Sequence, residues 1–145
     1  MRHTFLLDEG NWKAAGRYFD ADAKATEAEG EMRIVHRDTI WINEGSMRLL
    51  KDPPVTATNR YEIVPIAADA DFTTWTSANV ALGSLRGQFV LVRDAILSSY
   101  ESSKAGYRGI ETLLRQSDER YIARGALFKS NIKISSWAMT LTRQA

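Results

Sequence analysis

Hydrophobic and polar residues alternate in short runs along most of the chain, and clusters of polar turn residues separate the runs. In one run Met32, Ile34 and His36 fall on one face, and the residues between them fall on the other. The polar segment 20–24 (DADAK) is a turn that ends the preceding run. Alternation with a period of two predicts β-strands. The predicted strands are residues 11–20, 25–37, 39–50, 58–66, 71–77, 88–94, 95–101, 107–115, 120–129 and 132–143, with a short piece at 84–86.

The number of strands and the short links between them predict an all-β fold. Links of about two to six residues join antiparallel neighbours, because parallel strands need long crossovers. An open sheet would leave two edges exposed, and closure removes both. We therefore expect residues 1–145 to form a single antiparallel up-and-down β-barrel of about 8–10 strands. A two-sheet sandwich is the alternative, and residues 4–9 could add one helical turn before the first strand.

Composition and charge exclude several classes of protein. The chain has 145 residues, enough for one domain, and its 19 basic and 18 acidic residues leave a net charge of +1. That balance gives no field to attract nucleic acid or an anionic membrane. There is no cysteine, so disulfides and thiolate chemistry are excluded. No apolar stretch is long enough for a membrane span or a signal peptide, so we expect a cytoplasmic protein.

Two features at the ends of the predicted barrel indicate a family. Gly10-Asn11-Trp12 begins the first strand, and Arg143 lies near the end of the last. This arrangement resembles the calycin superfamily (lipocalins, fatty-acid-binding proteins and relatives), of which the chain would be a divergent member. The resemblance implies that Trp12 closes the barrel floor and that Arg143 packs across its indole, where a desolvated cation–π pair contributes about 2 kcal/mol.

Residues able to bind metals or act as nucleophiles are scarce. The two histidines are His3, in a terminus that we expect to fray, and His36, which is in phase with apolar residues. A single strand histidine is more often a structural hydrogen-bonding group than a ligand. We predict no metal site, no haem, no cofactor and no serine triad. Three acids alternate along one strand face, which indicates a solvent face; they are Glu27, Glu29 and Glu31.

Arginines in phase with apolar residues are the candidate polar groups of a cavity. Arg93 is in phase with Phe89 and Leu91, and Arg124 is in phase with Ile122 and Phe128. An arginine inside a barrel needs a carboxylate partner, from the protein or from a ligand. The alternative is an arginine at the rim, or an ion pair with Glu62 or Glu111. The predicted ligand-binding residues are Arg93, Arg124, Tyr61, Trp41, Trp75 and His36.

The function expected from this pattern is binding of a small, largely apolar ligand inside the barrel, with an anionic head group as one option. Two alternatives stay open. One is a small enzyme of the same architecture, an isomerase or a chromophore lyase, for which Glu44, Glu62 or Tyr61 could act as acid or base. The other is a filled barrel that serves as an interaction module. The sequence singles out no catalytic residue and leaves homo-oligomerisation open.

Overall fold

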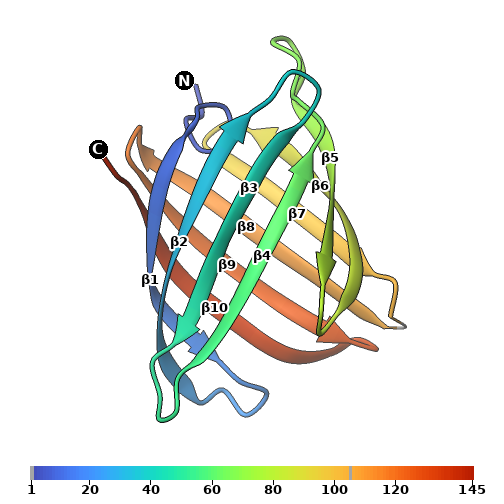
Figure 1. Cartoon of the computed structure of the whole chain (residues 1–145). Helices are drawn as coiled ribbons and strands as arrows, with labels where there is room; N and C mark the ends of the chain where they lie inside the picture. The colour runs from blue at the N-terminus through green and yellow to red at the C-terminus, as the bar shows by residue number, and fades with distance from the viewer. Residues whose placement is uncertain (1, 105) are drawn as a thin grey trace.

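Ten antiparallel strands close into one barrel in the computed structural model, which describes residues 2–104 and 106–145 (Figure 1). Each strand pairs with its neighbours in sequence, and β1 pairs with β10. The predicted all-β barrel is confirmed, and the sandwich alternative is wrong. The strands are β1 (Gly10–Phe19), β2 (Ala25–His36), β3 (Trp41–Leu49), β4 (Val55–Ile63), β5 (Phe72–Asn79), β6 (Gly83–Val92), β7 (Ala95–Ser102), β8 (Tyr107–Ser117), β9 (Arg120–Lys129) and β10 (Ile132–Arg143).

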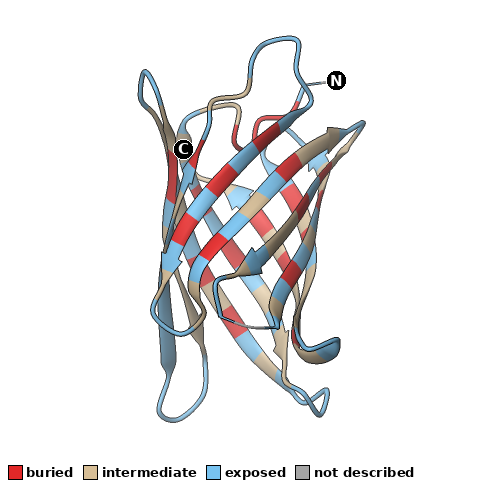
Figure 2. Cartoon of the chain, turned by 90° about the vertical axis from the view of Figure 1, so that its right-hand side faces the viewer, coloured by how far each residue is buried: buried red, intermediate tan, exposed pale blue. Residues whose placement is uncertain are grey.

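Alternation along the strands separates an interior from an exterior face. On β5, Thr73, Trp75 and Ser77 are buried while the residues between them are exposed, and Figure 2 shows the same alternation on other strands. Side chains of one phase share a face across paired strands, because register partners point the same way. The register therefore assigns each strand residue to the barrel interior or to its outer surface.

Two predicted strand boundaries move in the structure. β4 begins directly after Pro54 and ends at Ile63, two residues before Pro65, because proline cannot donate to a strand ladder. β6 is continuous from Gly83 to Val92, so the predicted short piece 84–86 belongs to it. Gly87 does not interrupt the strand, and the side chain of Trp75 lies over it from the neighbouring strand.

The N-terminal segment closes one end of the barrel. Phe5 and Leu6 are buried there, and Phe5 packs edge-on against Trp12, with 5.2 Å between the ring centroids. A backbone hydrogen bond from Asp8 to Thr4 closes a single turn. The φ angle of Leu6 is +73°, so this turn does not continue as a helix. The structure thus has a turn here, without the helical geometry considered for residues 4–9.

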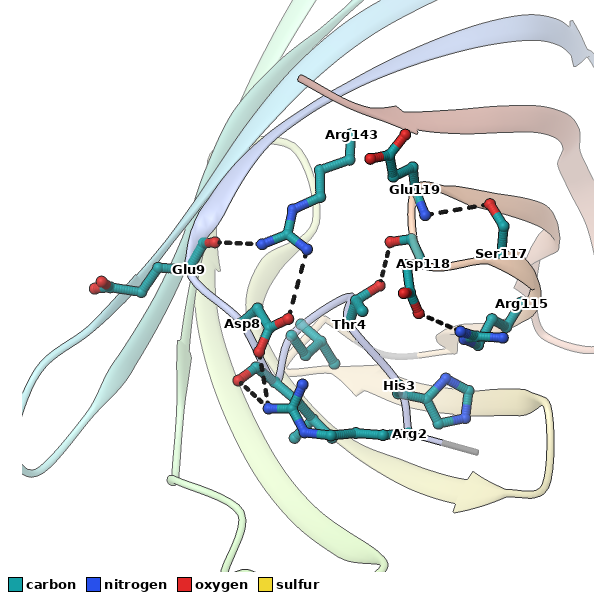
Figure 3. Close-up of polar contacts among 12 residues, drawn as sticks. Arg2, His3, Thr4, Asp8, Glu9, Arg115, Ser117, Asp118, Glu119 and Arg143 are labelled. Carbon is teal, nitrogen blue, oxygen red and sulfur yellow. Dashed lines mark hydrogen bonds and ion pairs between the residues drawn. The ribbon is translucent and has the colours of Figure 1, made fainter. Parts of the chain in front are cut away.

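Polar contacts hold this segment against the barrel (Figure 3). The hydroxyl of Thr4 donates to the carbonyl oxygen of Asp118 in the β8–β9 turn at 2.5 Å. His3, which we expected to fray, is instead buried, because its ring bonds to the hydroxyl of Tyr121 at 2.7 Å and to the carbonyl oxygen of Arg93 at 2.9 Å. The terminus is therefore a built part of the barrel floor.

Trp12 and Arg143 lie at this closed end as the family resemblance implies, but with different contacts. The two residues are register partners on β1 and β10, and Trp12 is 1% exposed. The guanidinium of Arg143 contacts the carboxylate of Asp8 at 3.5 Å and donates to the carbonyl oxygen of Glu9 at 3.1 Å (Figure 3). The polar partners of Arg143 therefore belong to the N-terminal segment.

The wall of the barrel is weakest between β4 and β5. These strands pair over only three positions, from Tyr61 opposite Ser77 to Ile63 opposite Trp75. Below this short ladder the two strands diverge, toward the end of the barrel away from the termini (Figure 1). Among the described residues, the first half of β4 (55–60) pairs with β3 alone. We call this stretch the β4–β5 seam.

Candidate functional site

Among the residues that the structure describes, a single carboxyl group faces the middle of the barrel interior. Glu111 on β8 is in phase with Gly109 and Leu113, which are buried, and its register partners are Ser98 on β7 and Gly125 on β9. The indole nitrogen of Trp137 donates a hydrogen bond to Oε2 of Glu111 at 2.6 Å. Glu111 is therefore held by a neutral donor and not by a cation.

Aromatic side chains surround this carboxyl. Tyr61 meets Trp75 edge-on at 4.8 Å between ring centroids, and Tyr100 lies 5.6 Å from Trp75. All three point into the interior. Trp75 lies opposite Ile63 and Tyr100 lies opposite Gly109, both of which are buried, and Tyr61 has the same phase as Ile63. The site thus combines one acid with several aromatic faces.

Glycines on neighbouring strands let these aromatic rings lie close to the wall. A Cβ built on Gly87 would come within 2.3 Å of the Trp75 ring, and one on Gly125 within 2.3 Å of the Trp137 ring. Gly109 has the same relation to Tyr100, at 2.1 Å. Because these rings lie over the glycines, close to the barrel wall, the centre of the interior is left to side chains that extend further from the wall.

Burial perturbs the ionisable groups of the site. Burial raises the pKa of the Glu111 carboxyl, and the hydrogen bond from Trp137 offsets only part of that effect. The pKa of Tyr100 is raised to about 12, mainly by burial and also by the nearby charge of Glu111. The pKa of Tyr61 is raised for the same reasons. Burial thus makes ionisation of the acid and of both phenols less favourable than in water.

Basic residues of the described chain stay out of the middle of the interior. The basic residues whose strand positions face inward are Arg115 on β8, Lys129 on β9 and Arg143 on β10. Each of them lies at or near an end of its strand. Arg115 pairs with Asp118 in the β8–β9 turn, and the ammonium of Lys129 lies over the ring of Tyr107. The interior carboxyl therefore has no cationic partner among the described residues.

The interior is packed more tightly at the closed end than at the opposite end. Ile34, Ile63 and Ile96, near the N-terminal segment, are at most 1% exposed. Toward the opposite end the inward side chains of Met47 and Tyr18 are only half-buried. Tyr61, Glu111 and Trp137 are also half-buried. The polar centre of the barrel thus retains accessible surface that the closed end lacks.

A groove of about 760 Å³ lies on the outer surface, across β4 to β8. Its charged lining includes Arg86, Glu101 and Arg108, which are exposed, outward-facing register neighbours of alternating sign. This groove is open to solvent, and charged side chains lie along it. It gives an apolar molecule little burial, whereas the interior offers aromatic faces around one polar group.

The structure brings together only part of the predicted ligand-binding set. Tyr61 and Trp75 are in contact in the interior, beside Glu111. His36 and Trp41 lie at the closed end, stacked at 3.9 Å between centroids, and Nε2 of His36 bonds to the carbonyl oxygen of Leu6 at 2.8 Å. These two residues therefore contact the N-terminal segment and lie away from the acid.

The expectation that Arg93 and Arg124 face the interior is wrong. Arg93 is exposed in the two-residue β6–β7 turn with a φ of +54°, so the alternation of β6 ends before it. Arg124 is exposed on the outer face of β9, opposite Thr112 and Ala138. Its apolar phase neighbours are themselves on the outside, because the outer wall of this barrel also carries apolar residues.

The sequence analysis missed Glu111, Trp137 and Tyr100 as site residues. Glu111 entered it only as an ion-pair partner for an arginine. In the sequence, Glu111 shares a strand face with Gly109 and Leu113, which could have indicated an inward position. The opposite face carries Ile110 and Leu114 and is equally apolar, so the alternation did not identify the inner face. The candidate acids Glu44 and Glu62 are both exposed on the outer face.

The described residues offer neither a cluster of metal ligands nor a helix that could span a membrane. Residues 2–104 and 106–145 contain no group of three or more His, Asp or Glu placed to hold a metal ion. Over the same residues, no helix has the length and hydropathy that crossing a membrane requires.

Comparison with known proteins identifies the fold. No family model matches the chain, and no curated protein sequence matches it. Among solved structures, the S-type phycobiliprotein lyase CPES from Guillardia theta matches with a TM-score of 0.69 and 9% sequence identity, over 97% of this chain and 91% of that one. At this identity the match shows a shared barrel fold. The predicted barrel architecture is confirmed, and membership of the calycin superfamily stays a prediction.

Proposed function

We propose that this chain binds a small, largely apolar molecule inside the barrel, in contact with Glu111. The observation that carries the proposal is a half-buried interior carboxyl, next to aromatic rings, that has no cationic partner among the described residues. A buried carboxyl is costly unless it is neutral or paired, so such a group commonly marks a functional position. Apolar burial against the half-buried Tyr61, Tyr100 and Trp137 would supply most of the affinity, at about 25 cal/mol per Å². Glu111 would orient the ligand.

A matched pair of β7 variants tests where a ligand binds. Ser98 faces the interior beside Glu111, and its neighbour Ser99 faces the outer groove. We expect the neutral dye N-phenyl-1-naphthylamine to bind the wild type saturably, with quenching of tryptophan fluorescence. Ser98→Phe should weaken binding at least about tenfold by filling the interior, and Ser99→Phe should leave it unchanged. Circular dichroism checks that both variants fold.

Two results would overturn the interior site. One is the absence of saturable binding to the wild type. The other is loss of binding in Ser99→Phe with retention in Ser98→Phe, which would move the site to the outer groove.

A small enzyme of the same architecture is the second candidate function. Glu111 favours it, because a carboxyl that keeps its proton above the ordinary range can act as a general acid. The matching solved structure is also named a lyase. Mass spectrometry of a small-molecule extract, incubated with wild type or with Glu111→Gln, tests this function. A compound consumed only by the wild type supports an enzyme, and identical extracts contradict it.

A further inference from the structure

We propose that the ligand carries a protonated nitrogen, an amine or a basic heterocycle, which pairs with Glu111. The inference deepens the proposed interior site and depends on it. It replaces the anionic head group considered from the sequence, because the ionisable group in the middle of the barrel is an acid and not an arginine.

The hydrogen bonds of Glu111 leave room for a ligand donor. Oε2 accepts the indole N–H of Trp137, and no described side chain donates to Oε1. Glu111 is only half-buried, so its carboxyl side chain retains surface that a ligand can reach. An ionised carboxylate can accept several hydrogen bonds, and an ammonium group supplies up to three. One oxygen is thus held and the other is open to the interior.

The charges around the carboxyl favour a cation over an anion. No described basic side chain reaches the middle of the interior; Arg115, Lys129 and Arg143 are near strand ends. An anionic ligand would meet like charge with no counter-ion. A cationic ligand would form the ion pair that this buried carboxyl lacks, in a low-dielectric site where the attraction is strong.

The aromatic rings favour the same ligand class independently. Tyr61, Trp75, Tyr100 and Trp137 lie in the inward phase around Glu111. The faces of such rings attract cations within about 6 Å of the centroid, most strongly when the cation is desolvated. An acid surrounded by aromatic faces therefore presents two kinds of attraction to an ammonium group and only weak ones to a carboxylate.

Pairing would also move a proton. Burial raises the pKa of free Glu111, so over part of the pH range the carboxyl is protonated before the ligand arrives. An ammonium ligand would then displace that proton to solvent, R–NH3⁺ plus HOOC–Glu111 giving the R–NH3⁺/⁻OOC–Glu111 pair and H⁺. A neutral amine would instead take the proton from Glu111 directly. The ion pair is the same in both cases.

Three probes that share a naphthyl group separate the ligand classes: 2-(1-naphthyl)ethylamine, 2-(1-naphthyl)ethanol and the anion of 1-naphthylacetic acid. We expect the wild type to bind the amine at least about tenfold more tightly than the alcohol, and the carboxylate most weakly. Glu111→Gln should bind amine and alcohol within about twofold of each other. Glu101→Gln is the matched control, because Glu101 is exposed in the outer groove; it should keep the wild-type preference.

Calorimetry gives a second readout that does not require a variant. Titrating the amine in two buffers of different ionisation enthalpy, over a series of pH values from 4.5 upward, should show proton release that declines as free Glu111 ionises, and titrating the alcohol should show none; no release from the amine at any pH would contradict pairing with Glu111.

The outcomes separate this inference from the proposed function. Equal binding of amine and alcohol by the wild type, or an amine preference that survives in Glu111→Gln, would overturn the amine class and leave the interior site standing. Loss of the preference in Glu101→Gln, but not in Glu111→Gln, would assign it to the outer groove. Failure of all three probes, together with the dye, would overturn the interior site itself.

Discussion

Glu111 reduces the stability of the fold at neutral pH. Its pKa in the folded protein is raised above the ordinary value of 4.5 by burial. Below that pH the carboxyl is protonated in both states and contributes nothing. As the pH rises above it, the unfolded chain loses the proton first, so the free energy of unfolding falls until the pH passes the folded-state pKa.

Glu111→Gln should therefore be more stable than the wild type at pH 7, by about 1–3 kcal/mol, because the amide removes a buried charge and can still accept the N–H of Trp137. Urea unfolding at pH 4 and at pH 7 measures the effect. The two proteins should converge at pH 4, and a destabilised Gln variant at pH 7 would contradict the assignment of an unpaired acid.

His3 makes the closed end of the barrel sensitive to acid. Burial lowers its pKa below the ordinary value of 6.5, the positive charge of Arg115 lowers it further, and Asp94 and the bond to the Arg93 carbonyl act in the opposite direction. A neutral ring can donate from Nε2 to Arg93 and accept at Nδ1 from Tyr121. Protonation would put a second donor against the Tyr121 hydroxyl.

The stability from neutral His3 should be complete above pH 6.5 and fall as the pH drops below it, because the unfolded chain takes up the proton first. His3→Gln should flatten the change in melting temperature between pH 6.5 and pH 5, a window above most carboxyl titrations. A variant with the full wild-type slope would show that other groups cause it.

At the scale of the elements, the strands of the site are coupled by glycines under aromatic rings. Gly125 on β9 lies under Trp137 on β10, and Trp137 in turn bonds to Glu111 on β8. Gly125→Ala would place a methyl group within 2.3 Å of the indole ring. The ring must move, so the hydrogen bond to Glu111 should be lost.

We expect Gly125→Ala to cost about 1–3 kcal/mol of stability, which is typical of overpacking, and to change tryptophan fluorescence. Thr112→Ala, on the outer face of β8, is the control and should do neither. Unchanged stability and spectra in Gly125→Ala would mean that the ring does not lie over the glycine.

At the scale of the whole molecule, the barrel should open first along the β4–β5 seam. The amides of residues 55–60 have a ladder on the β3 side only, whereas β9 is paired along its length on both sides. Strand segments with fewer hydrogen-bonded neighbours open locally at a lower cost in free energy, so their amide hydrogens exchange faster. Exchange measured by mass spectrometry should be faster in residues 55–60 than in β9. Equal protection would mean that the seam is closed in solution.

The sequence by itself determined the architecture. Alternation with a period of two, together with Asp20–Lys24 and the prolines around β4, places strands and turns because these signals are local. The outward face of Glu27, Glu29 and Glu31 was also predictable, since three neighbouring acids cannot be buried together. In the structure they are exposed or half-buried beside arginines.

Only the tertiary structure decided which face of each later strand is the interior. Both faces of β8 and β9 carry apolar residues, so phase alone could not separate Glu111, which points inward, from Arg124, which points outward. Register with the neighbouring strands β7 and β9 settles that choice, because it places Glu111 beside Ser98 and Gly125. The burial of His3 depends in the same way on Tyr121, 118 positions along the chain. The polar centre of the barrel is thus a product of long-range pairing, which no local pattern encodes.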